Sequence, residues 1–170
     1  MNVTIDLIDA SASQGSVIPE IKDFQHWSAA ALHGIRGKEV TASVLPPVGE
    51  SGADIDEFEL SIRLVTKAES AELNEQYRHK HGATNILSFP MDSAMIQGIP
   101  LLGDLAICAD IVRDEALAQD KTELAHWAHL TVHGVLHLKG YDHENDKDAQ
   151  EMEKLEIQIL DTLGFNNPYL

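Results

Sequence analysis

The segment from His133 to His143 constrains this chain more than any other, because it holds three histidines, at positions 133, 137 and 143. Residues four apart lie on one face of an α-helix, one turn from each other. His133 and His137 therefore predict a helix that carries two imidazoles side by side. Gly140 can end that helix in the left-handed conformation that other residues resist. The turn that follows allows His143 to come back toward the pair.

Three neutral imidazoles that leave one coordination position open are typical of a catalytic zinc site. A structural site rich in cysteine is excluded, because the chain has a single cysteine, Cys108. The sequence therefore predicts one zinc ion per chain on His133, His137 and His143, although nickel and copper also bind imidazole. The spacing matches the metalloprotease signature H-E-x-x-H-x-x-G-x-x-H, except that Gly134 stands where the glutamate should be. That glutamate is the general base of a metalloprotease, so the chain keeps the metal ligands without the base.

Two further histidines, His126 and His129, lie on the same predicted helix, which we expect to span 122–139. They extend the histidine stripe toward the start of the helix, beside an apolar stripe that recurs at steps of three and four. We expect them to pack against or support the metal ligands rather than to bind metal themselves.

The remaining pattern alternates strands and helices along one domain of 170 residues. Pro19 stands at the first turn of the first predicted helix, and Thr66 and Glu69 are expected to cap the second one reciprocally. A strand at 39–44 and one at 58–64 suggest a hairpin around the loop at 46–53. The stretch at about 37–56 is interpreted as a loop insertion rather than a domain boundary. Asp104 interrupts an apolar run, so it needs a partner or role, unless it lies on an edge strand. The expected strands span 3–7, 58–64, 84–90 and 101–107, and the expected helices span 19–33, 67–77, 110–119, 122–139 and 145–163.

Composition indicates a protein of the cytoplasm. One cysteine forms no disulfide within the chain, which fits a reducing compartment, and Cys108 is expected to be buried. The first residues lack the features of a signal peptide, and no apolar run is long enough for a membrane span. The formal charge of −16 argues against non-specific binding of nucleic acid, although a local basic patch remains compatible with it. Acidic residues concentrate at 50–59 and 144–161, which we interpret as solvated surface.

The most basic stretch runs from Tyr77 to Gly82 and includes Arg78. A helix exit with ordinary charges would explain it, because cations are favoured at the C-terminal end of a helix. It could equally bind a phosphodiester, whose cleavage requires cationic stabilisation of charge that develops on the phosphoryl oxygens. Arg78 is the best-placed candidate, because a guanidinium binds phosphate through two parallel hydrogen bonds.

These motifs together resemble the YbeY family of bacterial rRNA-maturation factors. The segment 133–143 resembles the family signature H-G-x-L-H-L-x-G-Y-D-H. The family's other blocks follow the same order at 77–78, 84–90 and 102–105, and the similarity runs from about Phe58 to Gly164, with a weaker match over the first helix. The stretch from about Gly37 to Asp56 is longer than we expect for the family.

The resemblance implies a zinc-dependent endoribonuclease, specific for single strands, that acts in 16S rRNA 3′-end maturation and ribosome quality control. By position, His133, His137 and His143 would be the zinc ligands, with Arg78 as the phosphate-binding catalytic residue beside His133. The implied fold is one α+β domain with a mixed four-stranded sheet, packed helices and a zincin-like metal site on a helix and the following turn. The implied partners are the 16S rRNA precursor and the ribosome or its assembly proteins, without a membrane.

Two alternatives stay open from the sequence. One is a metallohydrolase of peptides or of another small substrate, against which the glycine at 134 weighs. The other is a non-catalytic, metal-stabilised ribosome-assembly factor. For a nuclease, the attacking group can be water or the RNA 2′-hydroxyl.

Overall fold

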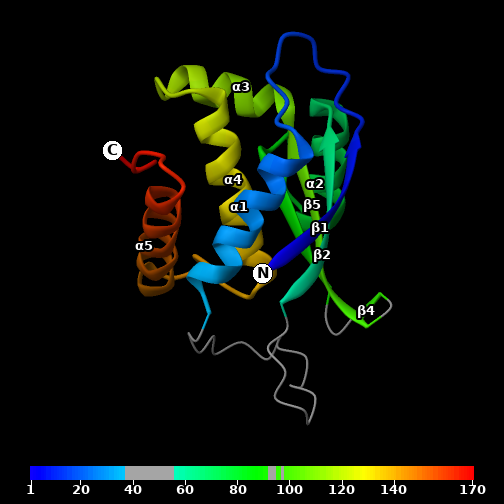
Figure 1. Cartoon of the computed structure of the whole chain (residues 1–170). Helices are drawn as coiled ribbons and strands as arrows, with labels where there is room; N and C mark the ends of the chain where they lie inside the picture. The colour runs from blue at the N-terminus through cyan, green and yellow to red at the C-terminus, as the bar shows by residue number, and fades with distance from the viewer. Residues whose placement is uncertain (37–55, 92–94, 97) are drawn as a thin grey trace.

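Four strands form a mixed sheet at the centre of the protein (Figure 1). The computed structural model describes residues 1–36, 56–91, 95–96 and 98–170. The strand order is β1-β2-β5-β3, in which β1 and β2 are parallel, β2 and β5 are parallel, and β3 runs antiparallel to β5. A two-residue strand, β4, pairs with the start of β5. This confirms the predicted α+β fold with a mixed four-stranded sheet. The strands are β1 (Asn2–Asp9), β2 (Glu57–Val65), β3 (Ile86–Pro90), β4 (Met95–Ile96) and β5 (Ile99–Cys108).

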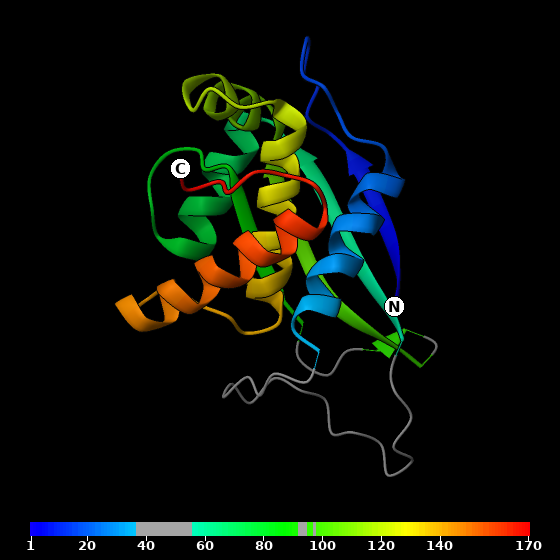
Figure 2. The same cartoon turned by 60° about the vertical axis from the view of Figure 1, so that its left-hand side comes forward.

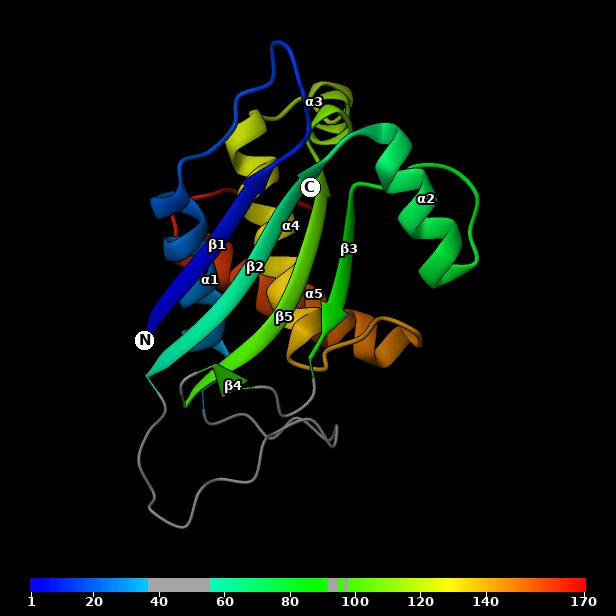
Figure 3. The same ribbon diagram turned by 90° about the vertical axis from the view of Figure 1, so that its right-hand side faces the viewer.

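Helices cover both faces of this sheet. On one face α1 and α4 pack against the strands, and α5 packs against these two helices from the outside (Figures 1 and 2). On the other face α2 packs beside β5 and β3 (Figure 3). The helices are α1 (Ile21–Gly34), α2 (Lys67–Arg78), α3 (Ala109–Ala118), α4 (Glu123–Leu138) and α5 (Asp146–Thr162).

Alternation along the strands creates the main core. Val3 and Ile5 of β1 are buried, whereas Thr4 and Asp6 between them are exposed. The apolar side of the sheet meets α1, α4 and α5 in one continuous cluster that includes Trp127, which is fully buried. A smaller cluster lies under α2 and contains Cys108, as expected for a small buried side chain.

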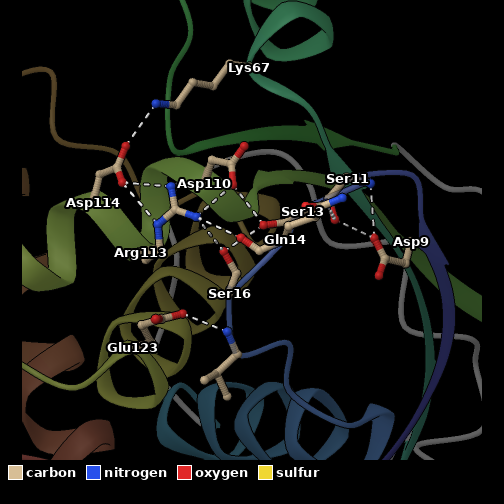
Figure 4. A network of polar contacts seen from close by, with 11 residues as sticks. Asp9, Ser11, Ser13, Gln14, Ser16, Lys67, Asp110, Arg113, Asp114 and Glu123 are labelled. Atoms are coloured by element: carbon tan, nitrogen blue, oxygen red, sulfur yellow. Dashed lines mark hydrogen bonds and ion pairs between the residues drawn. The ribbon is translucent and has the colours of Figure 1, made fainter.

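A network of polar contacts fastens the segment between β1 and α1 to the start of α3 and α4 (Figure 4). The hydroxyl of Ser13 donates to Asp110 over 2.8 Å, and the backbone N–H of Val17 donates to Glu123 over 2.9 Å. Arg113 bridges to Asp110 and also donates to the carbonyl of Gln14 over 3.4 Å. The network therefore fixes the start of α4, the helix that carries the histidines.

Several local predictions need correction. Pro19 precedes the helix rather than opening it, because the N-cap residue of α1 is Glu20. Thr66 caps α2 as predicted, but the Glu69 carboxylate binds Arg63 over 2.7 Å instead of closing the reciprocal contact. Asp104 lies on β5, which pairs on both sides with other strands, so it is not on an edge strand. The strand predicted at 39–44, and with it the hairpin and the insertion, lies outside the described residues.

Among the residues described, no helix combines the length and the apolar character that crossing a membrane requires.

Candidate metal centre

The helix that carries the histidines, α4, is fixed at both ends by its own sequence. At its start the Thr122 hydroxyl oxygen accepts a hydrogen bond from the Ala125 N–H over 3.1 Å. At its end Gly140 has a φ of 89°, in the left-handed region predicted for it. The N–H of Tyr141 then donates to the carbonyl of Leu136 over 3.1 Å, which completes the helix-ending turn. These contacts direct the chain back past the last turn of α4.

The turn brings the three predicted histidines together. Their ring nitrogens include a set, one from each residue, that lie within 4.8 Å of one another. The two Nε2 atoms of His133 and His137 are 3.1 Å apart, close to the roughly 3.3 Å that two nitrogens on a tetrahedral zinc would have with Zn–N bonds of about 2.0–2.1 Å. His133 and His137 are half-buried and His143 is exposed, so the cluster is open to solvent on one side.

A buried carboxylate lies behind His133. Glu156 of α5 is fully buried, and one of its oxygens lies 2.6 Å from Nδ1 of His133. The other oxygen contacts Nε2 of His129 at 3.3 Å and accepts a hydrogen bond from the Tyr169 hydroxyl. Because Nδ1 of His133 donates to this carboxylate, the lone pair of the neutral ring lies on Nε2 and faces His137. Such a carboxylate behind a histidine is the usual support of a metal ligand.

The pKa values of the site keep the groups in the protonation states that metal binding requires. Burial alone would raise the pKa of Glu156, but the hydrogen bonds from His129 and His133 outweigh it and hold this pKa at about 2. Burial, together with the nearby His133 and His143, lowers the pKa of His137 to about 4. Glu156 is therefore an anion and His137 a neutral imidazole near neutral pH. The donor set thus fits a cation that binds imidazole nitrogen.

Gly134 faces the sheet rather than the histidine cluster. A Cβ built on it would lie 2.7 Å from Cδ1 of Ile86 on β3 and 2.8 Å from Cδ2 of Leu105 on β5. Contacts this short require the neighbours to move, so glycine at 134 allows α4 to pack close to the two strands. A glutamate at this position would start from a Cβ that collides with these two side chains, so the observed packing does not accommodate it.

Arg78 is the last residue of α2, the helix that lies beside the edge strand β3 (Figure 3). Its guanidinium donates to the carbonyl of Ser88 over 2.6 Å and lies over the ring of Phe89, 5.9 Å from the ring centroid. The same strand contacts α4 through Ile86. Arg78 and the histidine helix are thus attached to one edge strand, and the part that Arg78 plays at the site stays a prediction.

Comparisons with known proteins identify the family. The family model described as Endoribonuclease YbeY matches residues 26–164. The chain belongs to the YbeY family. A relative named Endoribonuclease YbeY, from Nitrosococcus oceani, is 47% identical over 99% of this chain and 98% of its own length. A relative of the same name from Coxiella burnetii is 49% identical, with 93% of each chain covered.

A solved structure agrees at the level of the fold. The solution structure of a Thermotoga maritima protein aligns with a TM-score of 0.51 at 21% sequence identity, and the alignment covers 95% of this chain and 92% of that one. The YbeY match begins at His26, within α1, so the similarity that the motifs indicated over the first helix is confirmed.

The first two histidines of α4 support the fold. His126 is almost completely buried, and its Nε2 lies 2.5 Å from a carboxylate oxygen of Glu115 on α3. Glu115 also accepts hydrogen bonds from the side-chain amide of Asn85, which directly precedes β3. His129 contacts Glu156, as described above. These contacts agree with the expectation that His126 and His129 have packing or supporting roles rather than binding metal themselves.

Sequence reasoning missed Glu156 and Tyr169. The acidic segment 144–161 was interpreted as solvated surface, and Glu156 contradicts this because it is fully buried. Its position was a usable signal, since residue 156 is four after Met152 and three before Ile159, on the apolar face of α5. Nothing local to Tyr169 indicates its contact, because its partner is 13 residues away in the sequence.

Proposed function

We propose that this protein is a metal-dependent endoribonuclease that cleaves single-stranded RNA in 16S rRNA 3′-end maturation and ribosome quality control. The observation that carries the proposal is the cluster of three histidine nitrogens on α4 and its turn, with Glu156 behind the first of them. Membership of the YbeY family supports the reaction class, and the names of the relatives support RNA as the substrate.

We propose one zinc ion on His133, His137 and His143. The donor set supports zinc over harder cations, because magnesium and calcium prefer oxygen ligands whereas zinc binds imidazole readily. When bound, zinc would polarise a phosphoryl oxygen or lower the pKa of a water to about 7. The exposed side of the cluster at His143 leaves room for substrate.

The chain's own residues orient and stabilise the reacting groups. Glu156 holds His133 with its Nε2 directed at the cluster, and the low pKa of His137 keeps that ring neutral. Arg78 would bind a non-bridging oxygen of the scissile phosphate and stabilise the negative charge that grows there. The Ser88 carbonyl and the Phe89 ring support this by holding the guanidinium at the edge of β3.

Peptide hydrolysis is disfavoured by the packing of Gly134. The base of a metalloprotease would have to occupy a position where even a Cβ lies 2.7 Å from Ile86.

The exposed basic stretch from Arg78 to His81 supports a polyanionic substrate in a chain of net charge −16. Because so acidic a chain is repelled by bulk RNA, we propose that the ribosome or its assembly proteins bring the enzyme to its substrate. The whole chain would act as one domain.

The test is cleavage of a defined single-stranded RNA by purified protein. Wild type is expected to cut, whereas His133→Ala and Arg78→Ala are each expected to lose at least about 100-fold, the scale of losing one stabilising donor. Arg63→Ala is the matched control, because it removes an exposed arginine that binds Glu69 on another part of the surface. Equal cleavage by wild type and both variants would show that the activity belongs to a contaminant and that the assignment is wrong.

A further inference from the structure

The segment after α5 returns to the metal centre and ends beside Glu156. It is anchored independently of Tyr169, because the Phe165 N–H donates to the carbonyl of Leu160 over 2.9 Å and its ring meets Trp27 edge to face. Beyond this anchor, the ring of Tyr169 contacts the ring of His129 with a centroid distance of 5.5 Å. Its hydroxyl donates to the carboxylate of Glu156. The tyrosine as a whole is 45% exposed, whereas the carboxylate that its hydroxyl contacts is fully buried.

The two carboxylate oxygens of Glu156 have different hydrogen-bond partners. Among the residues that the structure describes, Oε1 contacts only His133, at 2.6 Å from Nδ1. Oε2 is shared by the Tyr169 hydroxyl and by His129, whose contact at 3.3 Å is long. Without the tyrosine hydroxyl, Oε2 of a fully buried carboxylate would keep one weak partner. The orientation of the carboxylate would then be fixed less firmly, and the loss of one hydrogen bond to a buried charge is costly.

We propose that Tyr169 is a positioning residue of the metal centre: its hydroxyl fixes the Glu156 carboxylate, which fixes His133 in the tautomer and orientation that present Nε2 to the metal. The segment after α5 is thereby part of the metal site, although it supplies no ligand. This inference rests on the proposed function, because it takes His133 as a ligand. The contribution of Tyr169 and Glu156 to zinc affinity can be measured separately from that of the three histidines.

The expected effect follows from the behaviour of residues that support metal ligands, whose substitution costs about 10- to 100-fold in metal affinity. Tyr169→Phe removes one hydroxyl and keeps the ring contact with His129, so we expect the lower end, about 10-fold. Glu156→Gln removes the charge and disturbs both oxygens, so we expect about 100-fold. Tyr77→Phe is the matched control, because Tyr77 is an exposed tyrosine of α2 whose ring contact with Phe89 does not need its hydroxyl.

The experiment measures the dissociation constant for zinc by competition with a chromophoric chelator, using the full chain. Tyr169→Phe is expected to weaken zinc binding about 10-fold while the metal-free protein stays folded by circular dichroism, and Tyr77→Phe is expected to bind zinc as wild type does. In a Glu156→Gln background, the same tyrosine substitution should add less than about 2-fold, since the two residues act as one unit. Equal affinities for wild type and Tyr169→Phe, or the full 10-fold loss in the Glu156→Gln background, would overturn the proposal.

A second readout needs no metal. Imidazole ¹⁵N spectra of metal-free wild type are expected to show His133 as the single tautomer protonated on Nδ1, and Tyr169→Phe is expected to show a mixture. An unchanged single tautomer in Tyr169→Phe would overturn the inference. Failure of the wild type to bind zinc while the tautomer responds to Tyr169→Phe would contradict the proposed function and leave the positioning contact established.

Discussion

Replacing Gly134 by alanine tests how closely α4 packs on the sheet. The new Cβ would lie 2.7 Å from Cδ1 of Ile86 and 2.8 Å from Cδ2 of Leu105. Overpacking of this kind costs about 1–3 kcal/mol. Alanine in place of glycine inside a helix returns about 1 kcal/mol. We therefore expect Gly134→Ala to lower the free energy of unfolding by about 1 kcal/mol, where a helix without such neighbours would be stabilised by the same change.

A double-mutant cycle isolates the cause. Ile86→Val removes the Cδ1 that is nearest to the new Cβ, and by itself it costs about 0.5–1.5 kcal/mol. We expect Gly134→Ala to cost less in the Ile86→Val background, with a coupling of about 1 kcal/mol. Ile5→Val on β1, at the opposite edge of the sheet, is the control background. The assay is urea unfolding of chelator-treated protein followed by circular dichroism. Additivity within about 0.3–0.5 kcal/mol in the Ile86→Val background, or a stabilising Gly134→Ala, would refute the packing argument.

Three further predictions concern caps, pH and metal. Thr122→Ala should destabilise the protein by about 1 kcal/mol through loss of the α4 cap, measured by urea unfolding against Thr162→Ala at the end of α5; an equal effect of both would contradict it. Burial raises the pKa of Glu115, but the hydrogen bonds from His126 and Asn85 outweigh it and leave this pKa below its ordinary value of 4.5. The stabilisation that ionised Glu115 supplies is therefore present above the ordinary pKa and is lost as pH falls through the lower, folded-state pKa. Glu115→Gln should then lose less unfolding free energy on acidification than wild type does. An identical dependence on pH in the acid range would disprove this. Zinc at about 100 times its dissociation constant should raise the free energy of unfolding by about 2.7 kcal/mol in wild type and not in His137→Ala, and a similar rise in both would mean that zinc binds elsewhere.

Local patterns in the sequence were sufficient to predict much of the histidine helix. The start of the helix near Thr122, the spacing of His133 and His137 and the left-handed Gly140 are all encoded within a few residues of where they act. The mixed sheet was predicted with the family resemblance, and the strand pattern from Phe58 to Leu64 agrees with β2.

Contacts between distant segments were not predictable from local patterns. The sequence pattern relates Gly134 to the missing metalloprotease base, whereas the terminal methyls of Ile86 and Leu105 leave little room for a Cβ there. Glu156 was assigned to surface by the acidity of its neighbours, although the period of α5 placed it on the buried face. Pro19 was placed in the first turn of α1 because proline is common there, but the chain uses Glu20 as the cap.

The most direct test of the account is a zinc titration of metal-free protein, with single-stranded RNA cleavage measured at each step. We predict that cleavage is absent without metal, rises linearly with zinc and reaches a plateau at about one equivalent per chain. In His143→Ala, the same titration should produce neither tight binding nor cleavage. Cleavage by chelator-treated protein, or a plateau that His143→Ala leaves unchanged, would contradict the claim that the three histidines hold the metal used to cut RNA.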